Sequence, residues 1–469
     1  MQARVVHEKI STINPATGQI IHSYKPTDTD EIPSIVNDAR TAFAKWKKKD
    51  VLERCDYIRS LAKELNKNKD KYAMIITQEM GKPIAQSYAE IEKCVWLCEY
   101  YCENAESFLQ DQIVPTEFRK SFVSFEPLGV VAGIMPWNFP FWQVMRFVVP
   151  TMIAGNVAIL KHSSVCIGSS LDIKDSFAEA GFPDNVFQIV IGNYRAGEAL
   201  VQSKIDAISV TGSVITGQRV AELAAKCLKK VVLELGGSDP FIVLEDADLD
   251  HTVPQATHSR LLNTGQSCIA AKRFIVVKKI ANKFADLFVQ SVKDEVVGDP
   301  MEKKTTVGPL VRDSQRQAII KQVDDARVKN AEILLGGNII DGGGFYYEPT
   351  IISKVNHGMQ ILTEEVFGPV APIIIVENEA EAIKEANNSE FGLGARIWTS
   401  SSEKGLMLAR EIQCGVVKIN EMVRSDPRLP FGGVKNSGIG RELSEFGIRE
   451  FVNVKSIAAK DITTKLVVE

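Results

Sequence analysis

The chain has 469 residues, more than one compact core usually serves, so two or three domains are expected. With 45% hydrophobic residues, 24% charged residues and a formal net charge of -4, its composition is that of an ordinary globular protein. This balance argues against a nucleic-acid-binding protein and against a basic protein of anionic membranes.

The sequence also predicts a protein without targeting or membrane segments. The first residues, MQARVVHEKISTINPATGQ, lack the apolar core of a signal peptide. The longest apolar stretch, 147–160, is too short to span a bilayer and is interrupted by Pro150 and Asn156. We therefore expect a cytoplasmic protein with no membrane partner.

The cysteines and histidines predict neither a disulfide framework nor a metal site. The eight cysteines form no CxxC pair, and the six histidines show no ligand spacing. Cys94, Cys98 and Cys102 recur every four residues, which places them on one face of a helix and favours core packing.

In chain order, residues 30–112 predict helices, because apolar residues recur there at three- and four-residue spacing. From about residue 122, short β-branched runs such as NVAILKHS and AISVTGS alternate with amphipathic segments such as TGQRVAELAAKCL. This alternation predicts a doubly wound parallel sheet. A second α/β series begins near residue 250, and the strand-like segments 113–127 and 450–461 belong to neither series.

A glycine-rich turn, VTGSVITGQRV (210–220), lies between a predicted strand and a predicted helix. Backbone N–H groups at such a helix start can bind a pyrophosphate. The chain has no GxGxxG, and the P-loop spacing from Gly212 to Gly217 continues with Gln-Arg instead of Lys-Ser/Thr. The turn alone is equally compatible with a plain helix cap.

Residues 263–274, NTGQSCIAAKRF, place Cys268 in a polar segment before an apolar run. A free cysteine is most often a small buried hydrophobe. Cys268 could therefore be a packing residue, a redox switch or a nucleophile, and the rest of the chain must decide.

Five segments match motifs of the aldehyde dehydrogenase superfamily in order and approximate spacing, and the chain resembles that superfamily over essentially its whole length. They are PWNFP (136–140), LELGG (233–237), GQSC (265–268), EEVFGP (364–369) and PFGGVKNSGIGRE (430–442). Four segments resemble the succinate-semialdehyde dehydrogenase branch more closely: PWNFPFWQVMRF, KHSS, GQSCIAAKRFIV and SDPRLPFGG.

The resemblance implies an α/β fold of the aldehyde dehydrogenase type, with a doubly wound cofactor domain, an interlocked α/β catalytic domain and a small β oligomerisation arm. The expected ranges are 1–112 and 128–236 for the cofactor domain, 237–449 for the catalytic domain, and 113–127 with 450–469 for the arm. Because a lone two-stranded ribbon is marginal in water, the arm should pair with a neighbouring subunit in a homodimer or tetramer.

For catalysis, the resemblance implies that Cys268 is the nucleophile that attacks an aldehyde carbonyl. Asn138 matches the side-chain amide that stabilises the resulting oxyanion, together with the Cys268 backbone N–H. Glu234 matches the general base that activates water to hydrolyse a thioester, a role suited to a carboxyl with a raised pKa. The next cysteine is Cys414, so a neighbouring CxC redox pair is missing.

For the cofactor, the resemblance implies a nicotinamide dinucleotide bound by the 210–220 turn and by residues from several segments. These residues are Trp137, Lys161, Ser164, Gly212, Ser213, Gly217, Leu235, Glu365 and Phe367. NAD-preferring relatives often carry KPxE where this chain has KHSS, residues 161–164. Serine at position 164 removes a carboxylate that would repel a 2′-phosphate, so we expect NADP to be preferred and NAD also accepted.

For the substrate, the resemblance implies that Arg146 and Ser425 contact the far carboxylate of succinate semialdehyde, and that Trp142 walls the tunnel. Arg260 is a second candidate cation. Other readings remain open: oxidation of glutarate semialdehyde or an aliphatic aldehyde, transfer of the acyl group to coenzyme A, or a non-catalytic structural protein that keeps the fold. Retention of Glu234 argues against acyl transfer.

Overall fold

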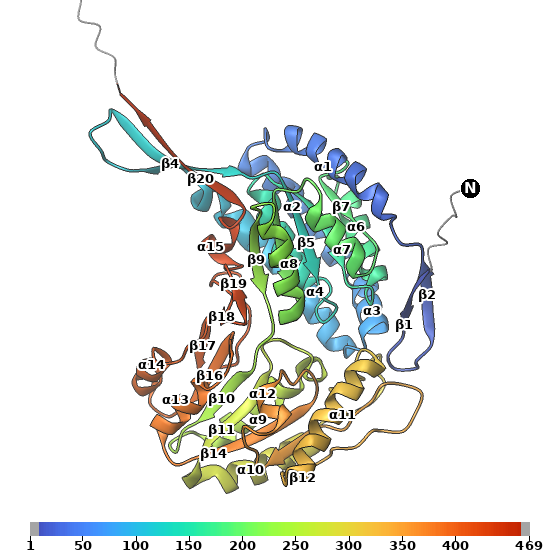
Figure 1. The fold of residues 1–469 in the computed structure, drawn as a ribbon, viewed down its shortest axis with the longest axis vertical. Coiled ribbons are helices and arrows are strands. Elements are labelled where there is room, and N and C mark those ends of the chain that lie inside the picture. Colours follow the sequence, from blue (N-terminus) through green and yellow to red (C-terminus); the bar gives the residue numbers. More distant parts are fainter. Residues whose placement is uncertain (1–8, 461–469) are drawn as a thin grey trace, which may run out of the picture.

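The computed structural model describes residues 9–460, which form two α/β bodies and a projecting ribbon (Figure 1). The first body is built on a six-stranded sheet of order β19-β9-β8-β5-β6-β7. Its strands are parallel except for β19, which runs antiparallel to β9. They span β5 (Val130–Met135), β6 (Val157–His162), β7 (Phe187–Ile189), β8 (Ala207–Thr211), β9 (Lys230–Glu234) and β19 (Gly438–Ile439).

Eight helices surround this first sheet. They are α1 (Ile32–Trp46), α2 (Val51–Lys67), α3 (Lys69–Met80), α4 (Ile84–Leu109), α5 (Trp142–Ile153), α6 (Ile167–Glu179), α7 (Tyr194–Gln202) and α8 (Val214–Ala225). Their starts follow local chemistry: Asp50 and Glu53 form a capping box at α2, and the Ser213 side chain caps α8. The helices predicted within 30–112 are present, and Cys94, Cys98 and Cys102 are buried in α4 as expected.

The second body contains a seven-stranded sheet of order β12-β13-β14-β11-β10-β16-β17, in which only β12 is antiparallel to its neighbour. Its strands span β10 (Asp239–Val243), β11 (Ala271–Val277), β12 (Glu332–Leu335), β13 (Thr350–Ser353), β14 (Val370–Val376), β16 (Gly394–Trp398) and β17 (Val416–Ile419). Its helices are α9 (Leu249–Leu261), α10 (Lys278–Lys293), α11 (Asp313–Val328), α12 (Gln360–Thr363), α13 (Glu379–Asn387) and α14 (Ser402–Ala409).

A ribbon of three antiparallel strands, ordered β20-β4-β3, extends away from both bodies (Figure 1). It consists of β3 (Gln112–Ile113), β4 (Lys120–Pro127) and β20 (Val452–Ala459), with Val452 opposite Pro127 and Ala459 opposite Lys120. The sequence predicted a two-stranded ribbon here, and β3 adds a third strand. Residues 1–8 of the expected cofactor domain and 461–469 of the expected arm lie outside the described residues.

Near residues 430–450, the chain returns from the second body to the first. The short strand β19 and helix α15 (Ser444–Ile448) fall within the range expected for the catalytic domain. Yet β19 pairs with β9 of the first sheet, and α15 contacts α4 and α5. The chain therefore returns to the first body before residue 449. Small ribbons, β1 (Ile10–Ile13) with β2 (Ile20–Tyr24) and β15 (Phe391–Gly392) with β18 (Val434–Lys435), complete the fold, together with two 3-10 turns, Thr29–Glu31 and Leu262–Gly265.

Parallel pairing in the first sheet brings several strand ends to one edge. Met135 of β5 lies opposite His162 of β6, and Thr211 of β8 lies opposite Glu234 of β9. The segments that follow these strands therefore meet at the carboxyl edge of the sheet, where α/β proteins bind ligands. No helix within residues 9–460 is long and apolar enough to cross a membrane.

Candidate active site

Two cavities meet at Cys268. The larger cavity has a volume of about 660 Å³ and lies between α4, α5 and the segment 422–431. The smaller cavity, of about 310 Å³, lies at the carboxyl edge of the first sheet. Cys268 and Gln143 line both of them. A group bound in either cavity can therefore reach the Cys268 thiol.

The turn before Cys268 has an unusual backbone. Asn263, Thr264 and Gly265 all have positive φ angles of 54°, 56° and 73°. Positive φ costs a non-glycine residue about 1–3 kcal/mol, so surrounding contacts must hold the turn. The Thr264 hydroxyl accepts from the Gly308 N–H at 3.0 Å, and the Asn263 amide donates to the Asn138 carbonyl at 2.8 Å.

Asn138 lies against the same turn. Its side-chain Nδ2 donates to the carbonyl of Gln266, two residues before Cys268, at 3.1 Å. The side chain is buried, at 4% exposure. The structure therefore brings the predicted oxyanion-binding amide to the loop that carries the predicted nucleophile.

Glu234 ends β9 and lines the smaller cavity beside Cys268. Its carboxylate is buried, and neither oxygen has a hydrogen-bond partner among the described residues. Burial, followed by the nearby Glu442 carboxylate, raises the pKa of Glu234 well above its usual value, while Arg146 and Arg441 oppose this shift. Gly432 makes room for the group, because a Cβ there would lie 2.5 Å from Glu234 Oε1.

The Cys268 thiol is also in a low-polarity environment. Burial raises its pKa to about 11, and the positive charges of Lys272 and Arg146 act in the opposite direction. Lys272 Nζ donates to the backbone carbonyls of Ser267 and Cys268 at 2.9 and 2.6 Å, and pairs with Glu365 at 3.1 Å. Lys272 was not among the predicted site residues, although it follows Cys268 by four residues in the sequence.

The smaller cavity collects six of the nine residues expected to bind the cofactor. They are Trp137, Gly212, Ser213, Leu235, Glu365 and Phe367. The rings of Trp137 and Phe367 meet edge to face at 5.7 Å, and the Glu365 carboxylate accepts from the Gly237 N–H at 3.0 Å. Segment 210–220 runs from the end of β8 into the first turns of α8, and the N-terminus of this helix favours a negatively charged group.

The other three expected cofactor residues do not line this cavity. Lys161 is the next-to-last residue of β6, and Ser164 follows two residues after the strand ends. Burial lowers the pKa of Lys161 to about 8. Gly217 has a packing role, since a Cβ there would lie 2.5 Å from the Leu235 side chain. It lets α8 approach the end of β9 closely.

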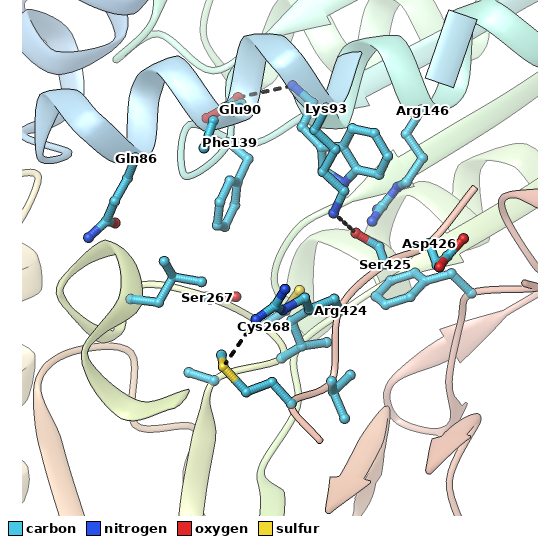
Figure 2. A pocket seen from close by; sticks show the side chains of 18 of the residues that line it. Gln86, Glu90, Lys93, Phe139, Arg146, Ser267, Cys268, Arg424, Ser425 and Asp426 are labelled. Carbon is cyan, nitrogen blue, oxygen red and sulfur yellow. Dashed lines mark hydrogen bonds between the residues drawn. The ribbon is translucent and has the colours of Figure 1, made fainter. Parts of the chain in front are cut away.

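The larger cavity is lined by three of the four residues expected to bind the substrate, Arg146, Trp142 and Ser425 (Figure 2). Arg146 is not a free cation, however, because it forms a buried ion pair with Glu442 and lies 4.8 Å from the Phe431 ring centroid. The Ser425 hydroxyl accepts a hydrogen bond from Lys93 Nζ at 2.8 Å.

Arg260 corrects the sequence prediction. It does not line the larger cavity, and its Nη2 donates to the Gly265 carbonyl at 2.7 Å. Burial lowers its pKa to about 9. Arg260 therefore stabilises the turn before Cys268 and does not face the substrate cavity.

Two further residues were missed at this site. Lys93 lies on α4, which the four-residue spacing of the cysteines predicted to be a core helix. That spacing does not indicate the cavity beside the helix. Glu442 closes the PFGGVKNSGIGRE motif, but only the fold shows that it pairs with Arg146 and influences Glu234.

Comparison with known proteins identifies the family of this chain. The model of the aldehyde dehydrogenase family matches residues 3–457. A probable NADP-dependent succinate-semialdehyde dehydrogenase of Synechocystis is 44% identical over 96% of this chain and 99% of its own. The NADP-dependent succinate-semialdehyde dehydrogenase 1 of Mycobacterium tuberculosis is 43% identical, with the same coverage.

Solved structures give the same result. Succinic semialdehyde dehydrogenase from Streptococcus pyogenes, solved in complex with NADP+, superposes with a TM-score of 0.94 and 36% identity. The match covers 96% of this chain and all of the streptococcal chain. On these similarities, and on a fold of the expected aldehyde dehydrogenase type, the chain belongs to the aldehyde dehydrogenase family.

Proposed function

We propose that this protein oxidises succinate semialdehyde to succinate with NADP+ as the preferred oxidant and NAD+ as an alternative. The observation that carries the proposal is the junction of the two cavities at Cys268, with cationic side chains lining the larger one. The printed names of the Synechocystis, mycobacterial and streptococcal relatives support the same substrate and cofactor.

The reaction begins when the Cys268 sulfur attacks the aldehyde carbon and the carbonyl oxygen becomes an oxyanion. The Asn138 amide and the Cys268 backbone N–H stabilise that oxyanion, and loss of one such donor typically lowers the rate about 100- to 1,000-fold. Because the pKa of Cys268 is raised, the thiol must lose its proton as the substrate reacts. The proton leaves to solvent, and the positive charges of Lys272 and Arg146 favour the thiolate.

The residues of the smaller cavity fit a nicotinamide dinucleotide. The cavity lies at the carboxyl edge of a parallel sheet, beside the N-terminus of α8, and the aromatic pair Trp137 and Phe367 lines it next to Cys268. When bound, NADP+ accepts the hydride that the former aldehyde carbon releases, which leaves a succinyl thioester on Cys268.

Glu234 completes the cycle as a general base. It takes a proton from water, the hydroxyl attacks the thioester carbon, and the C–S bond breaks to release succinate and the Cys268 thiolate. The absence of hydrogen-bond partners for Glu234 among residues 9–460 leaves its oxygens free to hold that water.

Cofactor choice rests on the adenosine side. We assign Lys161, Ser164, Gly212, Ser213, Gly217 and Leu235 to binding or positioning of the adenosine and phosphates, and Glu365 to the nicotinamide ribose. Ser164 presents no negative charge to a 2′-phosphate, which supports the preference for NADP+.

Substrate choice rests on Arg146, Trp142 and Ser425, which we assign to the carboxylate end of succinate semialdehyde. Arg146 approaches the site from α5 and Ser425 from the segment 422–431. A homodimer or tetramer formed through the ribbon, and a cytoplasmic location, complete the proposal. The eight cysteines are all free thiols, which fits a reducing compartment.

A steady-state assay tests the proposal. Purified protein is given succinate semialdehyde, glutarate semialdehyde and butyraldehyde, each with NADP+ and with NAD+. We expect the highest kcat/KM for succinate semialdehyde with NADP+. A higher value for either other aldehyde would overturn the substrate assignment, and a higher value with NAD+ would overturn the cofactor assignment.

A further inference from the structure

One cation in the larger cavity has no negative partner. Lys93 projects from α4 into the cavity, and its Nζ donates to Ser425 Oγ (Figure 2). Within the described residues, Lys93 forms no ion pair with a carboxylate. Its other close contact is the ring of Trp142, whose centroid lies 4.1 Å from Nζ. An ammonium in such a place lacks a balancing anion.

The helix that carries Lys93 is held firmly against α5. Glu90, one turn earlier on α4, accepts hydrogen bonds from the Phe141 and Trp142 N–H groups at 2.9 and 3.0 Å and pairs with the buried Lys82. It therefore caps the start of α5 from a neighbouring helix. This contact fixes Lys93 relative to Trp142 and Arg146.

Two cations of the larger cavity, Lys93 and Arg146, differ in their partners. The charge of Arg146 opposes the raised pKa of both Cys268 and Glu234. Arg146 is also neutralised by Glu442. Of the two, Lys93 is therefore the cation whose charge no carboxylate of residues 9–460 balances.

Buried donors around Lys93 are also unsatisfied. Trp142 Nε1 and Arg146 Nη2 are buried without a hydrogen-bond partner in the described part of the chain. Buried donors normally find acceptors, so an anion with two oxygens would suit this neighbourhood.

We propose that Lys93 is the cation that recognises the far carboxylate of the substrate, with the Ser425 hydroxyl beside it and Arg146 in support. The inference deepens the proposed function and rests on it for the identity of the aldehyde. Lys93, whose charge no carboxylate of the described residues balances, lies outside the five sequence motifs.

The surroundings of Lys93 give the proposal a pH signature. Burial, and then the charge of Arg146, lower the pKa of Lys93 to about 7. The groups that face it are Glu90 and Cys94 on its own helix, Arg146 on α5 and Asp426 on the segment 422–431, with His258, Arg424 and Arg428 elsewhere on the cavity wall. The pKa of Asp426 is lowered, that of Cys94 is raised and that of His258 is lowered, so these groups keep one charge state above pH 7.

The experiment compares wild type with Lys93→Met and Lys93→Arg, and uses Lys278→Met as a matched control at an exposed lysine of α10 that pairs with Glu377. For each protein, the ratio of kcat/KM for succinate semialdehyde to kcat/KM for butyraldehyde is measured from pH 6 to 9. The ratio cancels the ionisation of Cys268 and Glu234, which both aldehydes need.

For wild type, the ratio should fall as pH rises through about 7, because Lys93 loses its charge. Lys93→Met should lower the ratio at pH 6 by about 30-fold or more, as expected for loss of one partner of a buried charge pair, and make it independent of pH. Lys93→Arg should keep most of the ratio and also remove the pH dependence. Lys278→Met should behave as wild type.

Binding of succinate, measured by calorimetry, separates this inference from the proposed function. Weaker succinate binding in Lys93→Met than in wild type supports Lys93 even if another aldehyde proves to be the better substrate. An unchanged ratio and unchanged succinate affinity in Lys93→Met would overturn the inference, and would leave the oxidation of succinate semialdehyde by wild type standing.

Discussion

Cys268 combines a reactive role with an environment that disfavours its ionised form. Its pKa of about 11 means that little thiolate is present at neutral pH in the free protein. Alkylation by iodoacetamide should therefore accelerate by about tenfold per pH unit between pH 7 and 10, because the thiolate is the reacting species. The measurement is the rate of loss of dehydrogenase activity in a Cys227→Ser background, which removes an exposed thiol. A rate that levels off near pH 7 would contradict the raised pKa.

Ser164 carries the prediction of cofactor preference. Ser164→Glu should shift the ratio of kcat/KM for NADP+ to that for NAD+ at least about 5-fold toward NAD+, through repulsion of the 2′-phosphate. Ser164→Gln is the matched control, because it adds similar bulk without charge and should change the ratio less. If both variants shift the ratio equally, size and not charge decides.

At the residue scale, the sequence motifs were enough to predict the residues that line the junction of the two cavities. The side chains with which these residues interact could be identified only from the fold. Cys268, Asn138 and Glu234 lie in short segments whose chemistry is local. The pairing of Arg146 with Glu442 and the place of Lys93 join residues from distant segments. Arg260 was named as a second candidate cation from its place eight residues before Cys268, and the structure instead shows it donating to the Gly265 carbonyl within the turn that precedes Cys268.

Among the elements, α6 shows how the first body holds its helices. α6 has no cap from its own N-cap side chain, and the Glu79 carboxylate of α3 instead accepts from the Gly168 and Ser169 N–H groups at 2.7 and 2.9 Å. Glu79→Ala should lower the free energy of unfolding by at least about 2 kcal/mol, because it leaves buried donors unpaired.

Urea unfolding of the cofactor-free protein provides the measurement. Glu79→Gln keeps one acceptor oxygen and should lose less. The control Glu92→Ala removes an exposed carboxylate that pairs with Lys69, and should change the free energy by less than about 1 kcal/mol. Equal stability of Glu79→Ala and wild type would contradict the capping role.

Periodicity was a good guide to long elements and a poor one to short or irregular ones. The helices in 30–112 and the strand and helix alternation around the glycine-rich turn were predicted. Helix α9 was not assigned, because it contains Pro254 and lacks a clear apolar stripe. Strand β19 has two residues, and its pairing with β9 depends on contacts that no local pattern reports.

At the scale of the whole molecule, the projecting ribbon is the feature that most strongly indicates an oligomer. It leaves an edge strand, β20, with Val454 61% exposed. We expect light scattering at micromolar concentration to give a homodimer or tetramer. Val454→Asp should shift the mass toward the monomer, because a charge would be buried in the interface. Leu228→Asp is the control, since Leu228 is 95% exposed on another surface. A monomeric wild type would refute the assembly.

The central claim is that the protein oxidises succinate semialdehyde with NADP+ through a covalent thioester on Cys268, which Glu234 hydrolyses as a general base. The most direct test is the intact mass of Glu234→Gln after rapid mixing with succinate semialdehyde and NADP+. We predict one succinyl group per subunit on Cys268, in an amount equal to the burst of NADPH. The double variant that also carries Cys268→Ala should show no adduct. A burst without the adduct, or an adduct on another residue, would contradict the account.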